Sequence, residues 1–327
     1  MSFFSRASNL VADDNDDISD VFLYNRNTEA IERIDRGPDR FFPVGSSISA
    51  DGLFVAIPTS VGNGDILVYD RAAASFERVA AEIAVEVIGG NGESNAPSVS
   101  EDGRFVAFES SASNLVDGDT NNASDIFVYD RDSDSNQLLT VGANGDSFNA
   151  SMSGDGRFVA FESSASNLVI GDNNGVTDIF VYDRELASTE LLTLGGNENS
   201  VNPSISGDGR FVAFESLAST FAEGDTNGLS DIFVYDRETQ TTELLIANAN
   251  GESTAPSISR DGRFVAFVSQ ATNFFGGDDR LTAVLNIFVY DRTTDSTEQL
   301  TTDTGQQFIA GEDGSSTEPV ILSLIHI

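Results

Sequence analysis

The sequence repeats itself, and this repetition limits the possible folds more than any other feature. The segment GRFVAFESSASNLV occurs unchanged at 103–116 and 156–169, and GRFVAFES returns at 209–216. The Asp-Gly pairs at the start of these segments lie 51, 53, 53 and 53 residues apart, at Asp51, Asp102, Asp155, Asp208 and Asp261. Each of the 6 tyrosines occupies the same place in the repeat, so the chain contains six copies of one structural unit.

Each repeat is predicted to contain four short strands separated by turn-forming residues. In the fifth repeat these strands are expected at 203–206, 210–216, 231–237 and 242–247. The second strand of the third repeat places Phe105 and Ala107 on one face and Val106 and Phe108 on the other. Because both faces are apolar, a sheet built from such strands must be covered on both sides.

A four-stranded antiparallel sheet flanked by copies of itself meets this requirement, and closing the ring protects the terminal copies. The sequence therefore predicts one all-β domain over 1–327, a six-bladed β-propeller. Its repeats are expected at about 1–45, 46–93, 94–146, 147–199, 200–252 and 253–315. A linear solenoid is the competing architecture, but its repeats usually span about 20–30 residues and its ends need polar caps.

The ring is predicted to close through the end of the chain. Residues 8–11 (SNLV) align with 113–116, so the first repeat begins late in its second strand and lacks its first strand. Residues 316–323 are expected to supply that strand, because 318–323 resembles the first strand of the sixth repeat. Residues 324–327 form a doubtful tail. The alternative is a fragment of a longer array, cut within a blade at each end.

The repeat also resembles a known family. Its pattern S-x-x-D-G-R-F-V-A-F-x-S, followed by D-I-F-V-Y-D-R, is similar to the WD-like repeat of TolB-type propellers, whose usual form is a Ser-Pro-Asp-Gly turn, a strand and then Asp-Ile-Tyr-Val. The resemblance covers nearly the whole chain and implies a propeller that serves as a platform without naming its partner. Two departures are a longer, Asp/Asn-rich loop and the lack of an appended hydrolase or TolB-like N-terminal domain.

The charge of the chain limits its partners. It has 53 acidic residues against 17 basic ones, all arginine, and a formal net charge of −36. Such a polyanion should repel nucleic acid and anionic lipid. The acidity has two readings, a solvated surface that keeps the protein soluble or adaptation to salty water, and cation capture is compatible with both. There is no cysteine, and hence no disulfide or thiolate site.

The loop between the second and third strands of a repeat, called the long loop below, is the candidate binding site. Side-chain oxygens of Asp and Asn recur there at positions i, i+2 and i+6. Such oxygens converge when a loop curls around a hard cation, and calcium takes about six to eight of them. The candidate ligands are Asp14, Asp16 and Asp20 in repeat one, Asp119, Asn121 and Asp125 in repeat three, Asp172, Asn174 and Asp178 in repeat four, and Asp225, Asn227 and Asp231 in repeat five.

Calcium binding is one of two interpretations of the long loops. In the other, Asp and Asn only form Asx-turns in a polar loop. Repeat two offers GNGD at 62–65 and repeat six has Asn286 in place of the last Asp, so neither is expected to bind calcium. A complete EF-hand is excluded, because its twelfth position, Asp130, lies about 16 Å beyond Asp125 along an extended strand.

Other recurrent charged residues are interpreted as structural. The triplet Tyr129-Asp130-Arg131 and the arginine after the first turn, Arg104, return in later repeats, whereas an active site needs a single geometry. A Ser-His-Asp or Cys-His site has almost no support, since His326 in the tail is the only histidine.

The sequence therefore favours a non-catalytic binding or scaffolding module, in which the long loops and the loops that join successive repeats share one edge. The partner is expected to be a protein or a glycan, and not a nucleic acid or a membrane interior. A monomer in an extracellular or periplasmic setting is expected, although 1–11 lacks the features of a signal peptide. The alternatives are a carbohydrate-active hydrolase with paired carboxylates on the propeller axis, and a spacer within a large surface protein.

Overall fold

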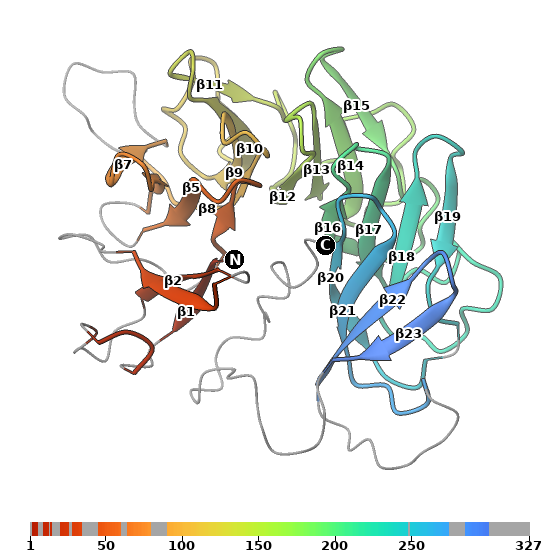
Figure 1. Ribbon diagram of the computed structural model, residues 1–327. Coiled ribbons are helices and arrows are strands. Elements are labelled where there is room, and N and C mark those ends of the chain that lie inside the picture. The colour runs from red at the N-terminus through yellow and green to blue at the C-terminus, as the bar shows by residue number, and fades with distance from the viewer. Residues whose placement is uncertain are drawn as a thin grey trace. The chain divides into compact units, whose positions relative to one another are not determined.

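The chain has an all-β fold, a six-bladed β-propeller with four-stranded antiparallel blades (Figure 1). The computed structural model describes residues 2–5, 9–12, 14, 20–25, 28–34, 45–59, 64–79, 90–247, 249–274 and 285–300. These residues divide into two compact halves, one ending at Ala150 and the other starting at Ser151. No helix in the described ranges is long and apolar enough to cross a membrane.

Each repeat forms one sheet, with its strands in sequence order. The strands of repeats one to three are β1 (Ser2–Ser5), β2 (Asp20–Asn25) and β3 (Ala30–Arg33), then β4 (Ser47–Ile48), β5 (Phe54–Pro58), β6 (Ile66–Asp70) and β7 (Ser75–Arg78), and then β8 (Ser94–Val99), β9 (Phe105–Ser110), β10 (Asp125–Asp130) and β11 (Ser135–Leu138). The strands of repeats four to six are β12 (Ser147–Met152), β13 (Phe158–Ser163), β14 (Asp178–Asp183) and β15 (Ser188–Leu191), then β16 (Ser200–Ile205), β17 (Phe211–Ser216), β18 (Asp231–Asp236) and β19 (Thr241–Leu244), and then β20 (Ser253–Ile258), β21 (Phe264–Ser269), β22 (Asn286–Asp291) and β23 (Ser296–Gln299).

The prediction of four strands per repeat is confirmed in repeats two to six. In repeat five the first strand begins at Ser200 instead of 203, and the last strand ends at Leu244 instead of 247. In repeat one, β1 pairs with β2 as a second strand pairs with a third, with Ser5 opposite Asp20, so the chain does enter within the second strand. The predicted closing strand at 316–323 and the tail at 324–327 lie outside the described residues, and ring closure stays a prediction.

The core is built from the two middle strands of each sheet. Strands β9 and β10 pair from Phe105 opposite Asp130 to Ser110 opposite Asp125, which sets Phe108 directly across from Phe127. Both rings are fully buried, and their centroids lie 5.7 Å apart in a stacked arrangement. Val106 and Ala107, on opposite faces of β9, are also fully buried, which confirms that both faces of the sheet are covered.

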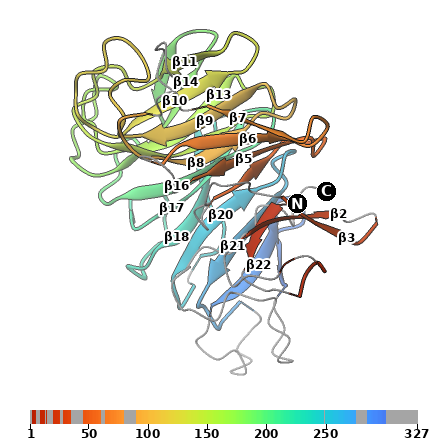
Figure 2. The same cartoon turned by 90° about the vertical axis from the view of Figure 1, so that its left-hand side faces the viewer.

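Neighbouring sheets within each half cover one another. In the second half, β16, β17 and β18 each contact β20 of the next blade, and Figure 2 shows these sheets as successive layers. In the first half, β4, β5 and β6 contact β8 in the same way.

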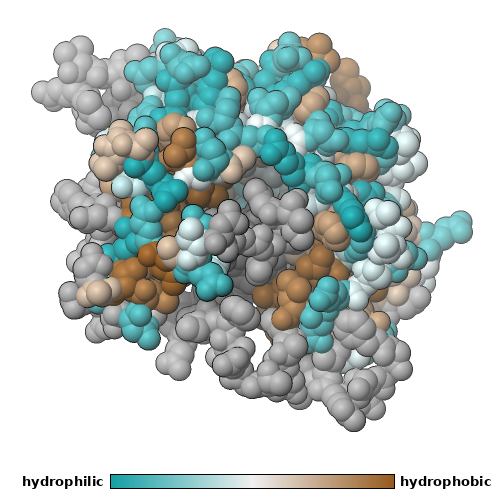
Figure 3. All heavy atoms as spheres, in the orientation of Figure 1, coloured by the Kyte–Doolittle hydropathy of each residue, from teal (hydrophilic) through white to brown (hydrophobic). Residues whose placement is uncertain are grey.

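Hydrophilic residues dominate the coloured part of the face shown in Figure 3, in keeping with the net charge of −36.

The long loops and the connecting loops, which join one repeat to the next, meet at the same edge of the sheets. In repeats three to six, the first residue of the first strand donates its backbone N–H to the last residue of the preceding long loop, as Ser147 does to Ser124 at 2.7 Å and Ser253 to Ser230 at 2.8 Å. The Asp-Gly turns and the ends of the third strands lie at the opposite edge, because successive strands are antiparallel. The prediction that both loop types share one edge is confirmed.

Candidate metal centre

A buried carboxylate stands at the start of the third strand in five of the six repeats. Its exposed fraction is 1% for Asp20 and Asp65, 0% for Asp125 and Asp178, and 2% for Asp231. These positions are buried because the third strand runs through the middle of a sheet that is covered on both faces. A buried carboxylate is unfavourable unless hydrogen bonds or a positive charge compensate for the water that it has lost.

In repeats three to five the long loop brings a second carboxylate to the first. Burial raises the pKa of Asp125, and the nearby charge of Asp119 raises it further. Repeat five repeats this arrangement: burial raises the pKa of Asp231 to about 6, and Asp225 adds to the rise. The positions predicted from spacing, i and i+6, therefore do meet as pairs of like charges.

Several oxygens of these pairs have no hydrogen-bond partner. Within the described part of the chain, no protein group donates a hydrogen bond to Oδ1 of Asp119 or Oδ2 of Asp125, and the same atoms of Asp172 and Asp178 lack a donor. In repeat five both carboxylate oxygens of Asp225 are buried without a donor, and the residue is only 7% exposed. Buried, unpartnered and negatively charged oxygens are the donor atoms that a hard cation such as calcium takes.

The asparagine at position i+2 has a different role in the structure. Asn121 accepts the backbone N–H of Ala123 at 3.0 Å through its side-chain oxygen. Its amide nitrogen donates to Oδ1 of Asp125 at 3.2 Å and to the carbonyl oxygen of Ala143 at 3.3 Å. Asn227 makes the equivalent three bonds in repeat five. The Asx-turn is thus present at the asparagine, while the two aspartates of the loop keep oxygens free for a ligand.

Two threonines that the sequence analysis missed support the same aspartates. Thr140 donates its hydroxyl to Oδ1 of Asp125 at 2.5 Å, and Thr193 donates to Oδ1 of Asp178 at 2.6 Å. Each hydroxyl also accepts a backbone N–H, so its single proton is committed to the carboxylate. The recurrent Leu-Leu-Thr at 138–140 and 191–193 was the available signal. Repeat five has Ile246 in this place.

Repeat one differs from the prediction in its surroundings. Arg33 on β3 lies 3.4 Å from Oδ2 of Asp20 and 3.6 Å from Oδ1 of Asp14, so its guanidinium group faces both predicted ligands. Asp16 lies outside the described residues. Repeat two also has an arginine, Arg78 on β7, which forms an ion pair with Asp65. In repeat six, Gln299 donates to the side-chain oxygen of Asn286 at 3.1 Å. These strand residues were not singled out from the sequence.

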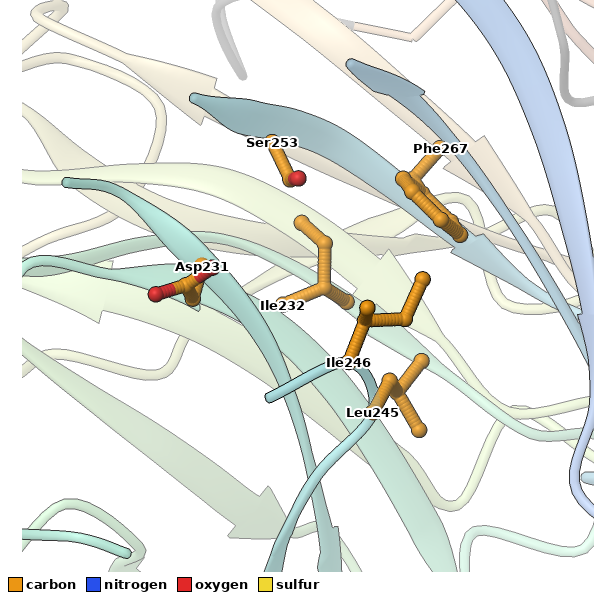
Figure 4. Close-up of a pocket in the computed structure, with 6 residues that line it drawn as sticks. All are labelled: Asp231, Ile232, Leu245, Ile246, Ser253 and Phe267. Carbon is orange, nitrogen blue, oxygen red and sulfur yellow. The ribbon is translucent and has the colours of Figure 1, made fainter. Parts of the chain in front are cut away.

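A cavity adjoins the loops in repeat four, and an apolar group of side chains lies beside the loop in repeat five. The cavity, of about 350 Å³, is lined by residues of the long loop and the connecting loop, Gly171, Asp172, Asn173, Asn174, Leu191, Leu194, Gly195 and Gly196. In repeat five the Asp231 carboxylate points away from an apolar group formed by Ile232, Leu245, Ile246 and Phe267 (Figure 4). Among the described residues, no group of three or more His, Cys, Asp or Glu side chains is placed to hold a metal, so the long loops of repeats three to five each bring two carboxylates together.

The Tyr-Asp-Arg triplets lie at the opposite edge and form ion pairs. Arg104 binds both carboxylate oxygens of Asp130, at 2.9 and 2.8 Å, and Arg210 binds Asp236 in the same way at 2.9 and 2.7 Å. Arg131 donates to the carbonyl oxygen of Gly103 at 2.9 Å, which ties the end of the third strand to the Asp-Gly turn. The structural interpretation of these residues is confirmed.

Comparison with known proteins identifies the fold. No protein-family model and no curated protein matches the chain. Among solved structures, TolB from Acinetobacter baumannii has a TM-score of 0.55 at 18% identity and covers 87% of this chain, which spans 60% of the length of that protein. A putative TolB from Agrobacterium tumefaciens also has a TM-score of 0.55, at 20% identity over 86% of this chain and 88% of its own.

An enzyme shares the same architecture. Oligogalacturonate lyase in complex with manganese has a TM-score of 0.57 at 12% identity, over 90% of this chain and 74% of its own. Because binding proteins and enzymes both use this architecture, identities this low establish the fold alone. The resemblance inferred from the repeat motif is confirmed at that level: this chain has the six-bladed β-propeller fold of TolB.

Proposed function

We propose that the chain is a non-catalytic binding module whose long and connecting loops, stiffened by bound calcium, present one edge of the propeller to a protein or glycan partner. The observation that carries this proposal is the aspartate pair with buried, unpartnered oxygens in three successive long loops. A device repeated from blade to blade serves the scaffold, because a catalytic centre needs a single geometry that the repeat does not provide.

The connecting loops are fastened to the long loops beside them. The backbone N–H of Asn91 donates to Asn114 at 2.8 Å, and Ser113 donates its own N–H back to Asn91 at 2.8 Å. In repeat six the backbone N–H of Asn250 likewise donates to Asn273 at 3.2 Å, and Thr272 donates its N–H to Asn250 at 2.7 Å. A Cβ at Gly92 would lie 2.5 Å from the backbone of residue 111, so only glycine permits this close approach. The edge is therefore a set of mutually braced loops, as a binding surface requires.

The net charge of the chain and the proposed calcium ions indicate the kind of partner and the location of the module. A net charge of −36 disfavours polyanionic partners, which leaves neutral glycans and basic or neutral protein surfaces. Loops that supply only two carboxylates each favour the weak sites that extracellular modules use, with dissociation constants on the order of 10⁻⁴–10⁻³ M. A monomer acting outside the cytoplasm, in an extracellular or periplasmic space, suits these properties.

An array of neutral and acidic glycans and of purified extracellular proteins tests this proposal. The labelled chain should be retained on a subset of spots in 2 mM calcium (about the upper end of the expected dissociation constants) and lose retention in excess EDTA. The glycans that retain it should release no new reducing ends. Release of reducing ends would show that the chain is a hydrolase and not a binding module. Equal retention in EDTA would show that partner binding does not depend on calcium.

A further inference from the structure

One position on the fourth strand decides how each repeat compensates its buried third-strand aspartate. The residue paired with the central Phe or Leu of the third strand is Arg33 opposite Phe22 in repeat one and Arg78 opposite Leu67 in repeat two. In the other repeats this position is held by Leu138, Leu191, Leu244 and Gln299. The backbone register is the same throughout, so the six repeats differ at one comparable site.

The type of residue at this fourth-strand position correlates with the charges of the long loop and of the start of the third strand. Where it is arginine, its guanidinium group faces the buried carboxylate. Where it is glutamine, the aspartate is replaced by the neutral Asn286. Where it is leucine, in repeats three to five, the loop places a second aspartate beside the first, as Asp14 does in repeat one, but no arginine in the described part of the chain forms an ion pair with either aspartate. In repeats three to five, two carboxylates therefore lie together without an arginine on the fourth strand.

We propose that repeats three, four and five each bind one calcium ion between Asp119 and Asp125, Asp172 and Asp178, and Asp225 and Asp231, and that Arg33 and Arg78 occupy the equivalent place in repeats one and two. This inference rests on the calcium part of the proposed function and changes the expected number of sites from four to three. The remaining ligands are backbone carbonyls and water, since calcium requires about six to eight oxygens.

The fourth-strand residue and the long-loop aspartate lie beside the same space in repeat four. Leu191 and Asp172 line one cavity of about 350 Å³, so a longer, charged side chain at position 191 would extend beside the carboxylates. Opposite charges within hydrogen-bond distance favour the ionised carboxylates, whether the charge is a guanidinium group or a divalent ion. The competing arrangement is a single proton shared by the two carboxylates of each pair, which requires neither an arginine nor a calcium ion.

Calorimetric titration of EDTA-treated, dialysed full-length protein with calcium chloride tests the proposal. A stoichiometry of three is expected, together with a rise in melting temperature, because calcium binds the folded state. The substitution Leu191→Arg copies repeat two into repeat four, so the stoichiometry should fall to two. Leu191→Met changes the same side chain without adding charge and should keep three.

A second variant covers the case in which Leu191→Arg does not fold. The double substitution Asp172→Asn and Asp178→Asn copies the neutral arrangement of repeat six, and it should also leave two ions bound. Absence of heat and of any melting shift with the unsubstituted chain would overturn the proposal. Three ions bound by Leu191→Arg or by the double variant would overturn it equally. A chain that binds three ions but is retained by no glycan or protein would leave these sites intact and defeat only the proposed binding function.

Discussion

At the scale of single residues, the recurrent problem of this fold is the aspartate buried at the start of the third strand. Thr193 shows how one hydroxyl contributes to its solution, because its proton is donated to Asp178 and its oxygen accepts the N–H of Ile179 at 2.9 Å. Both Thr193 and Asp178 are almost fully buried, at 1% and 0% exposure. Water therefore cannot replace this donor at low energetic cost.

Replacing Thr193 by valine should lower the free energy of unfolding by about 1–3 kcal/mol, since it leaves a buried carboxylate oxygen without its donor. Chemical denaturation in EDTA measures this loss. Thr193→Ser keeps the hydroxyl and serves as the matched control, with a smaller loss from the missing methyl group. Equal destabilisation by valine and serine would show that packing, and not the hydrogen bond, is the important contribution.

The ion pairs at the opposite edge predict a dependence of stability on pH. Hydrogen bonds from Arg104 and Arg210 lower the pKa of Asp130 and of Asp236 to about 2. Because the folded-state value lies below the unfolded value of about 3.9, each pair stabilises the fold above pH 4 and loses this contribution as the pH falls toward 2. Melting temperatures measured from pH 5 to pH 2 should therefore decline steeply.

The variant Arg210→Gln should show a shallower decline over that range than the parent, because Asp236 then titrates more nearly as it does in the unfolded chain. Adding Asp236→Asn to this variant is the control, and the double variant should fall no more steeply than the single one. If Arg210→Gln and the parent decline in parallel, the pair contributes nothing to acid stability.

At the scale of the strands, the first strands of repeats three, five and six carry an irregularity that the sequence pattern concealed. The pairing of β16 with β17 shifts between Val201 and Ser204, and that of β20 with β21 shifts between Thr254 and Ser257. Within the shifts, Asn202 and Ala255 have positive φ angles of 53° and 51°. Alternation of inward and outward side chains is interrupted there, so the start of β16 at Ser200 could not be found from periodicity.

These irregularities join neighbouring blades. The backbone N–H of Asn202 donates to Glu162 of the preceding blade at 2.6 Å, and that of Ala255 donates to Glu215 at 2.7 Å. Alanine is unfavourable in the left-handed region, whereas glycine adopts it freely. Ala255→Gly should therefore raise the free energy of unfolding by up to about 1 kcal/mol, the part of the left-handed strain that exceeds the entropy of glycine.

Denaturation of Ala255→Gly measures this gain, and Ala266→Gly is the comparison. Ala266 lies fully buried in β21 and has no positive φ angle, so glycine should destabilise the protein there. A loss of stability at both positions would mean that the strain at Ala255 is negligible.

The middle strands were predictable because strands buried on both faces have unbroken apolar sequences. In repeat five the second strand begins one residue later than expected and the third ends one residue earlier. The aspartate pairs were likewise predictable from spacing. The counter-charges were not, because Arg33 and Arg78 lie 13 residues beyond the aspartates they face, on a different strand. Only the register of the sheet brings them together.

At the scale of the whole molecule, the repeat predicted the fold while the charge sets the conditions under which it is stable. A net charge of −36 makes the folded state repel itself, and each unneutralised aspartate pair adds to that repulsion locally. At 0.1 M ionic strength, salt screens the interactions between exposed charges that lie more than about 10 Å apart, but it screens the buried pairs much less. General screening and specific cation binding should therefore be separable.

In EDTA, raising sodium chloride from low to molar concentration should increase the melting temperature gradually and without saturation at low millimolar levels. Calcium chloride at constant ionic strength should add a further increase that does saturate. Potassium chloride should match sodium chloride, since screening depends on ionic strength alone. A calcium effect no larger than that of either monovalent salt would assign all the stabilisation to screening.

The dependence of each loop on one fourth-strand residue also has an evolutionary consequence. Repeats three and four share an identical stretch of 14 residues at 103–116 and 156–169, the kind of tract through which gene segments duplicate and recombine. A recombination that ends before β7 or β15 would separate a long loop from the fourth-strand residue that lies beside its carboxylates. By the calcium assignment proposed above, a copied long loop would bring a calcium requirement into a blade that had none, and a copied fourth strand would remove that requirement, while the register of the third and fourth strands would stay the same.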